Sequence, residues 1–66
     1  MISEYISKLE QKIDLTYDQM NEIMSEVLSG KTDDDQNMQI LSNLSKKGET
    51  DDELLGMLDK IGREHV

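Results

Sequence analysis

The sequence of 66 residues is enough for one small domain, and a domain of that size buries only about 60% of the surface that its unfolded chain exposes. With 15 acidic and 7 basic residues, the formal net charge is −8, which disfavours nucleic acid as a partner because phosphates are bound through basic patches. No cysteine is present to form a disulfide, and the first residues lack the apolar run of a signal peptide or a membrane span, so we expect a cytoplasmic protein without membrane contact.

Apolar residues recur at helical spacing along nearly the whole chain, and no segment alternates convincingly with a period of two. The first predicted helix begins at Ile2 and ends near Lys12. Its apolar stripe consists of Ile2, Ile6, Leu9 and Ile13. This spacing of three and four residues is typical of an amphipathic helix with one face toward a core.

The second predicted helix lies between Thr16 and Gly30. Thr16 is a residue type that caps helix N-termini, and Gln19 stands where its side chain completes a capping box. Leu15 is placed to pack on Met20 across the cap. The apolar stripe of this helix consists of Met20, Ile23, Met24, Val27 and Leu28.

The third predicted helix lies between Thr32, which we expect to be its N-cap, and Gly48. The aspartates at 33–35 fall in its first turn, where the helix dipole favours negative charge. Its apolar residues are Met38, Ile40, Leu41 and Leu44.

The segment from Lys47 to Glu53 ends one helix and starts the next. Gly48 can adopt the left-handed backbone conformation that closes a helix, and Thr50 with Glu53 forms a second capping box. The fourth predicted helix carries Leu54, Leu55, Met57, Leu58 and Ile61. The sequence therefore predicts an all-α fold, a compact bundle of four short helices forming a single helical domain over residues 1–66.

The candidate chemical motifs favour structural roles. The aspartates at 33–35 resemble the start of a calcium loop, but Met38 replaces the tight-turn glycine and Leu44 the terminal acid. His65 is the only imidazole and stands at the C-terminal end, without partners for metal binding or proton transfer. No nucleophile pattern is present, so we expect the chain alone to be non-catalytic, with no metal and no cofactor of its own.

Glycine and methionine also favour packing roles over binding roles. Gly56 and Gly62 belong to no phosphate-binding loop. Gly56 inside a helix costs about 1 kcal/mol relative to Ala, which indicates the close approach of a neighbouring helix. Four methionines fall on apolar stripes and are expected to fill the core, namely Met20, Met24, Met38 and Met57.

A set of short motifs in a fixed order resembles a known family. The motifs are Leu15-Thr16, Leu28-Ser29-Gly30, Asp35-Gln36, Leu41 with Leu44, Lys47-Gly48-Glu49-Thr50, and Glu53 with Gly56. Together they resemble the N-terminal helical domain of anthranilate phosphoribosyltransferase, which is shared with pyrimidine-nucleoside phosphorylases in glycosyltransferase family 3. The resemblance covers essentially the whole chain, and the Lys-Gly-Glu-Thr motif favours the anthranilate enzyme.

The resemblance implies a complete enzyme that transfers a phosphoribosyl group to anthranilate in tryptophan biosynthesis, with magnesium as its cofactor. The substrate and metal sites of that family, including a Gly-Thr-Gly-Gly-Asp loop, lie in a following α/β phosphoribosyltransferase domain, and no such loop occurs here. The helical domain packs against that domain across the substrate cleft and forms much of the homodimer contact. We therefore expect a fragment of a larger enzyme, with a second copy and the C-terminal α/β domain as partners.

The resemblance also implies that the first and third helices meet the second copy. Core and interface residues are expected among Ile6, Leu9, Ile40, Leu41 and Leu44. The sequence departs from the family at four polar positions of the third helix, which are Asn37, Gln39, Ser42 and Asn43.

A second class of function stays open from the residues alone, namely a stand-alone acidic helical adaptor that binds other proteins. An acyl carrier protein is a less favoured form of this alternative. Such a carrier needs a serine at the start of its second helix, and the corresponding place here reads Asp14-Leu15-Thr16.

Overall fold

The computed structural model of the chain describes residues 2–64, and that range contains four α-helices and no β-strand. The helices are α1 (Ile2–Glu10), α2 (Tyr17–Leu28), α3 (Asp34–Lys47) and α4 (Asp51–Glu64). The predicted all-α bundle of four short helices is confirmed. His65 lies outside the described residues. None of the helices in this range is long and apolar enough to cross a membrane.

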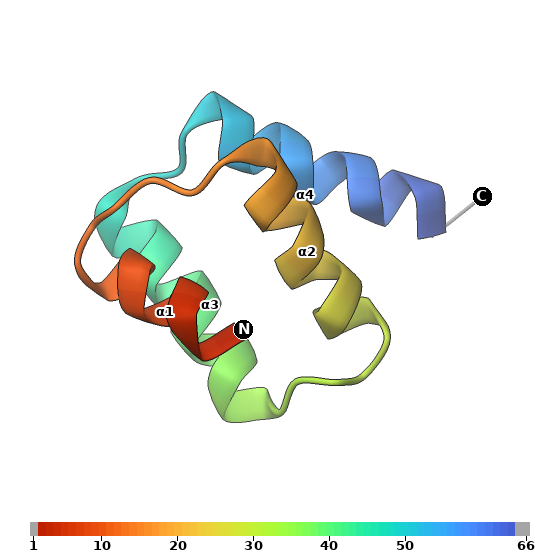
Figure 1. Ribbon diagram of the computed structural model, residues 1–66, viewed down its shortest axis with the longest axis horizontal. Coiled ribbons are helices and arrows are strands. Elements are labelled where there is room, and N and C mark those ends of the chain that lie inside the picture. Colours follow the sequence, from red (N-terminus) through yellow and green to blue (C-terminus); the bar gives the residue numbers. More distant parts are fainter. Residues whose placement is uncertain (1, 65–66) are drawn as a thin grey trace.

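The helices form two pairs (Figure 1). α2 packs most extensively against α4, α1 packs along α3, and a smaller contact between α1 and α2 joins the pairs. The buried apolar side chains come from α1, α2, α3 and the connection between α1 and α2: Tyr5, Ile6, Leu9, Leu15, Met20, Ile23, Ile40 and Leu44. From α4, the partly buried Met57 packs against this core, and Glu53 is fully buried.

α1 ends at Glu10, before the predicted boundary near Lys12. Lys12 has a φ of +61°, its amide donates to the Leu9 carbonyl, and the amide of Ile13 donates to the carbonyl of Lys8. These two bonds form a Schellman motif, which usually has glycine at the position of Lys12. Ile13 therefore lies beyond the helix and is exposed, so its predicted place on the helical stripe is wrong.

The capping box of Thr16 and Gln19 at the start of α2 is confirmed, but the predicted N-cap of α3 is wrong. Asp33, and not Thr32, caps α3: its carboxylate accepts from the amide of Gln36, and the Gln36 side chain accepts from the amide of Asp33. The reciprocal box requires Glu or Gln three residues after the cap, and only Asp33 has one there.

The glycines that follow α2 and α3 have positive φ values, +76° for Gly30 and +88° for Gly48. The ψ of Gly48 is 122°, so this residue ends α3 in a conformation more extended than the left-handed helical one. Thr50 and Glu53 then exchange both bonds of a capping box at the start of α4, as predicted.

Gly56 on α4 lies close against the start of α2. A Cβ atom at this position would be 2.7 Å from the carbonyl oxygen of Tyr17 and 3.0 Å from the Cβ of Met20. The side chain of Asn21 donates to the Gly56 carbonyl at 2.6 Å. The prediction that Gly56 permits close helix packing is therefore confirmed.

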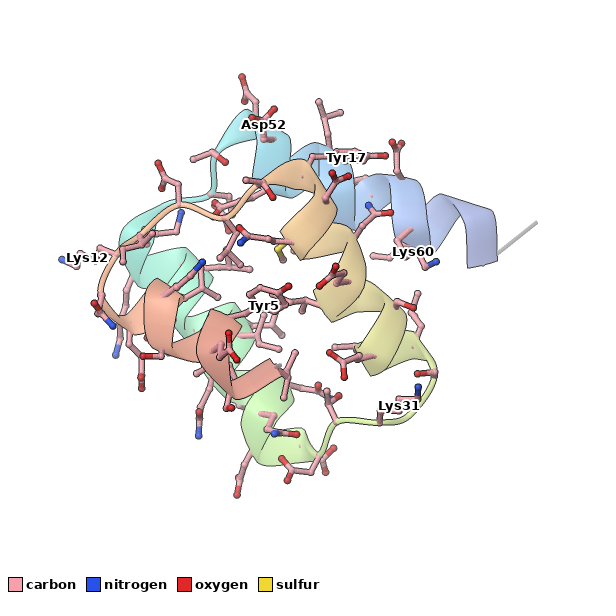
Figure 2. The ribbon with its side chains drawn as sticks, in the orientation of Figure 1. Tyr5, Lys12, Tyr17, Lys31, Asp52 and Lys60 are labelled. Carbon is pink, nitrogen blue, oxygen red and sulfur yellow. The ribbon has the colours of Figure 1, made fainter. Side chains whose placement is uncertain are left out.

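Two tyrosines link helices through their hydroxyl groups. Tyr5 on α1 donates to the carboxylate of Glu22 on α2, and Tyr17 on α2 donates to that of Asp59 on α4. The ring of Tyr5 points into the interior of the bundle (Figure 2). The hydrogen bond to Glu22 and burial both raise the pKa of Tyr5.

The buried carboxylate of Glu53 joins three parts of the chain. One oxygen accepts from the backbone amide of Leu15 at 2.6 Å, and the other accepts from the amide of Thr50 at 2.9 Å. The ammonium group of Lys47, whose side chain is only 3% exposed, lies 2.7 Å from Glu53 and 3.0 Å from Asp14. The connection before α2, the end of α3 and the start of α4 therefore converge on one carboxylate.

Charge pairing decides the ionisation of this cluster. Burial disfavours the charged form of Glu53, but the hydrogen bonds from Lys47, Leu15 and Thr50 outweigh it and lower the pKa of Glu53. Burial likewise opposes the charge of Lys47, but the bonds to Glu53 and Asp14 outweigh it and raise the pKa of Lys47. Both groups are therefore charged at neutral pH, and removing one partner leaves the other charge buried.

We predict that Gly56→Ala destabilises the domain by about 1–3 kcal/mol, because the added methyl group meets the backbone of α2. Gly62→Ala is the matched control on the same helix, since nothing lies within 4 Å of its added Cβ. The control is expected to stabilise by up to about 1 kcal/mol through helix propensity. Urea denaturation measures both, and equal midpoints for the two variants would show that α2 and α4 are not in close contact at Gly56.

We predict that Glu53→Gln lowers the free energy of unfolding by about 3 kcal/mol, because the Gln amide offers one acceptor oxygen in place of two and no negative charge to pair with Lys47. Glu49→Gln is the matched control, since Glu49 is exposed. It is expected to change the free energy of unfolding by less than about 0.5 kcal/mol. A Glu53→Gln midpoint equal to that of the control contradicts the structural role of this carboxylate.

The difference in stability between the parent chain and Glu53→Gln is also expected to depend on pH. Because the folded pKa of Glu53 is lowered, the unfolded chain takes up the proton first, and the stabilisation from Glu53 is complete above the ordinary Glu pKa of about 4.3. It is lost as the pH falls through the folded pKa. The difference in urea midpoint between parent and Glu53→Gln should therefore narrow below about pH 4.

Candidate functional site

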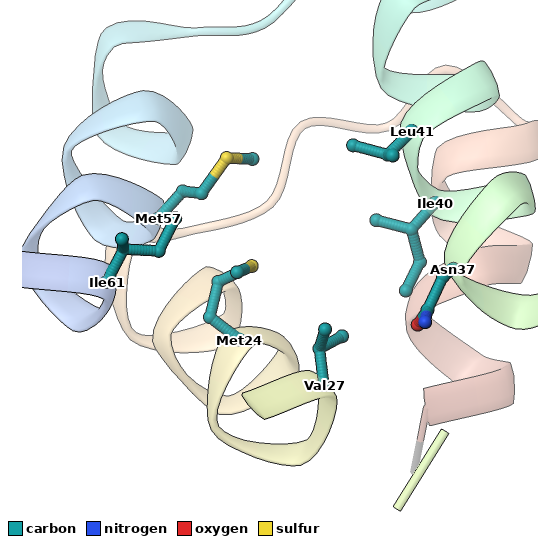
Figure 3. Close-up of a pocket in the computed structure, with 7 residues that line it drawn as sticks. All are labelled: Met24, Val27, Asn37, Ile40, Leu41, Met57 and Ile61. Atoms are coloured by element: carbon teal, nitrogen blue, oxygen red, sulfur yellow. The ribbon is translucent and has the colours of Figure 1, made fainter. Parts of the chain in front are cut away.

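An apolar groove opens between three of the helices (Figure 3). We call it the α2–α3–α4 groove, and its volume is about 310 Å³. Its lining residues are Met24 and Val27 from α2, Asn37, Ile40 and Leu41 from α3, and Met57 and Ile61 from α4. Asn37 is the only polar member, and its side-chain oxygen accepts from the hydroxyl of Thr32 at 2.6 Å. The lining is suited to apolar groups and offers little to a charged ligand.

The groove exists because of how the two helix pairs meet. α4 lies tightly against α2, and α3 is held by α1, but α3 makes no comparably extensive contact with α2 or α4. The α3 side chains face those of α4 across the opening, and Met24 and Val27 lie between them (Figure 3). The gap between α3 and α4 is therefore lined by apolar side chains at the edge of the small core.

A second apolar feature adjoins the groove. Leu54, Leu55 and Leu58 are 45%, 54% and 53% exposed, and we call them the α4 leucine row. Ile61 follows Leu58 by three residues and therefore lies on the same side of the helix. Because Ile61 also lines the groove, the α4 leucine row and the groove form one continuous apolar surface.

The residues expected at core and interface fall into two groups. Ile6, Leu9, Ile40 and Leu44 are buried in the core of the domain. Leu41 is 59% exposed and lines the groove. In this arrangement Leu41 is the one member of the predicted set whose side chain is largely available to another protein surface.

The expectation that methionines fill the core holds for only part of the set. Met20 is fully buried, whereas Met24 and Met57 are partly buried at the groove. Met38 is 65% exposed, so its predicted core position is wrong. It lies about 200° around the helix from Ile40, which faces the core, and α3 buries only that one side.

The charged groups of the described residues form no reactive arrangement. Among residues 2–62, Glu53 is the one fully buried charged residue, and its carboxylate is fully occupied by Lys47 and two amides. Asp33 is used as a helix cap. No three His, Cys, Asp or Glu side chains in this part of the chain are placed to hold a metal ion. The feature that the described residues do offer is the apolar surface of the groove.

Comparison with known proteins gives the family. The family model described as the helical bundle domain of the glycosyl transferase family matches residues 3–61. Anthranilate phosphoribosyltransferase of Nitrosopumilus maritimus (strain SCM1) is 69% identical over 61 residues, which are 92% of this chain and 18% of that protein. The enzymes of the same name from Syntrophobacter fumaroxidans and Cenarchaeum symbiosum are each 41% identical, over 85% and 82% of this chain.

The chain spans less than a fifth of the length of these relatives, 18%, 17% and 16% respectively. No solved structure matches the chain significantly. The family model covers most of the sequence, including all of α2 and α3 and the greater part of α1 and α4. The chain therefore belongs to the glycosyl transferase family, as a helical bundle domain of the kind that begins anthranilate phosphoribosyltransferases.

Proposed function

We propose that this chain is the non-catalytic helical domain of an anthranilate phosphoribosyltransferase, where it packs against the α/β phosphoribosyltransferase domain and forms one side of the substrate cleft. The observation that carries the proposal is the 69% identity to the Nitrosopumilus maritimus enzyme across 92% of the chain. The parent enzyme transfers a phosphoribosyl group to anthranilate in tryptophan biosynthesis, with magnesium held by the α/β domain. A cytoplasmic location is part of the proposal and is supported by the absence of cysteine.

The charge of the chain supports a non-catalytic role. A phosphoribosyl donor carries several negative charges, and binding it requires a basic or glycine-rich cradle. This chain has a net charge of −8, and its buried Lys47 is already paired with two carboxylates. The domain therefore contributes surface and position to the parent enzyme, and the reacting groups lie outside it.

Dimerisation is the second part of the proposal. A shallow depression of about 340 Å³ lies beside α3 and is lined by Glu10, Met38, Gln39, Ser42, Asn43 and Lys46. Met38 is the most exposed large apolar side chain of the described residues and stands in this depression. We propose that the surface of α1 and α3 meets a second copy there, through a contact that is more polar than a typical obligate interface.

A domain exchange tests the function. We predict that the Nitrosopumilus maritimus enzyme keeps its anthranilate phosphoribosyltransferase activity when its matching region is replaced by residues 1–66 of this chain. The control is the same enzyme with that region deleted, which is expected to be inactive. A chimera that unfolds cooperatively but has no activity, or a deletion variant that is fully active, contradicts the proposed role. An adaptor unrelated to the enzyme would give the first of these results.

Self-association tests the dimer. We predict that the chain associates weakly, at high micromolar concentration or above, and that Met38→Asp shifts it toward monomer, because a symmetric contact carries the new charge twice. The matched control is Leu28→Asp, since Leu28 on α2 is 43% exposed and lines neither this depression nor the groove. Sedimentation equilibrium with circular dichroism separates dispersal from unfolding. A folded parent that stays monomeric at millimolar concentration removes the dimer from the proposal.

A further inference from the structure

We propose that α4 has two orientations, and that the buried carboxylate of Glu53 holds it in the open one that the structure shows. In the closed orientation α4 is turned about its own axis, and the α4 leucine row lies in the α2–α3–α4 groove. The domain then covers this apolar surface with its own side chains. This inference concerns the domain by itself and does not depend on the proposed function.

Polar contacts, rather than apolar packing, hold α4 in the open orientation. None of the buried apolar side chains among residues 2–62 belongs to α4, and from this helix Met57 packs against the core only as a partly buried side chain. The contacts that fix α4 are instead the bonds of the Glu53 carboxylate and the hydrogen bonds that Asn21 and Tyr17 of α2 donate to the helix. Buried polar groups of this kind can select one packing arrangement at a cost in stability.

The apolar residues of α4 favour a different orientation. Leu54 and Leu58 are half-exposed beside an open apolar groove that Met57 lines. At the helical period, Leu54 and Leu58 lie about 60° and 100° around the helix from Met57, in the same sense. A turn of α4 through that arc therefore brings both leucines to face the groove. Removal of their apolar surface from water favours the closed orientation.

The closed orientation gives up the close approach between α4 and α2. The same turn moves the Met57 side chain toward the place of Gly56, where a Cβ atom would be only 2.7 Å from the Tyr17 carbonyl oxygen. The helix must therefore also move away from α2 and toward α3, and α3 makes no extensive contact with α4 that opposes this movement. Gly48, in the connection before α4, has the conformational freedom that the turn requires. Each orientation thus has its own set of contacts, as a two-state element requires.

Glu53 decides between the two orientations, because a carboxylate is stable in the interior only with its partners. In the open orientation it accepts from the amides of Leu15 and Thr50 and pairs with Lys47. Leu15 and Lys47 lie outside α4, so turning the helix breaks both of these contacts. Removal of the Glu53 and Lys47 charges together should therefore release α4 without leaving an unpaired charge in the interior.

Single thiols test the orientation of α4, since the chain has no cysteine of its own. Leu58→Cys, Met57→Cys and Leu28→Cys are each made in the parent chain and in a chain that carries Lys47→Met with Glu53→Met. This pair of changes removes one charge of each sign and leaves the net charge unaltered. The rate of reaction with uncharged N-ethylmaleimide reports the exposure of each thiol. Leu28 is the control position, because it is 43% exposed and does not line the groove.

With both charges removed, we expect the thiol at position 58 to react about tenfold more slowly and that at position 57 to react faster, while position 28 keeps its rate. Unchanged rates at all three positions would show that α4 keeps its orientation without Glu53, and would overturn the proposal. Faster reaction at all three would show a general loosening of the fold, and would overturn it as well. Circular dichroism checks that each variant is helical. If the double change unfolds the chain, Glu53→Gln replaces it in the same comparison.

Discussion

The carboxylate of Glu53 is the constraint on which the arrangement of the helices depends. It accepts hydrogen bonds from the amides of Leu15 and Thr50 and pairs with the ammonium group of Lys47. Since α3 belongs to one helix pair and α4 to the other, this carboxylate holds the two pairs together at one end. From that end α3 and α4 run in different directions (Figure 1), and the α2–α3–α4 groove opens where their side chains no longer meet.

The same constraint explains why α4 leaves its leucines outside. The side of α4 that faces the rest of the domain carries Glu53, which holds the connection before α2, and Gly56, which lets α2 approach. With these positions turned inward, the helical period places Leu54 and Leu58 on the outer side. A domain of this size cannot hide all of its apolar residues, and here the excess is gathered on one surface. This gathered apolar surface is suited to contact with another protein surface.

The helices and most of their ends follow from local rules. Thr16 with Gln19 and Thr50 with Glu53 identify two helix starts, and the positive φ at Gly30 follows from its place after α2. Local rules were insufficient where neighbours compete: Thr32 and Asp33 can both cap a helix, and the position of Gln36 decided in favour of Asp33. At the end of α1, Lys12 has the positive φ that glycine usually provides. Because no glycine stands there, the sequence does not mark this helix end. These differences move an end by a residue or two and leave the bundle unchanged.

The contact surface was less predictable, because an apolar stripe does not tell which of its members face the core. Four of the five residues expected at core and interface are in the core, and only Leu41 is largely exposed.

The hydrogen bond from the Leu15 amide to Glu53 joins residues 38 positions apart, so no local sequence pattern predicts it. Hydrogen exchange of the Leu15 amide tests the central role of Glu53 most directly. We expect protection close to that of the core amides of α2, whereas exchange at the rate of an unstructured peptide would show that Glu53 does not hold this amide.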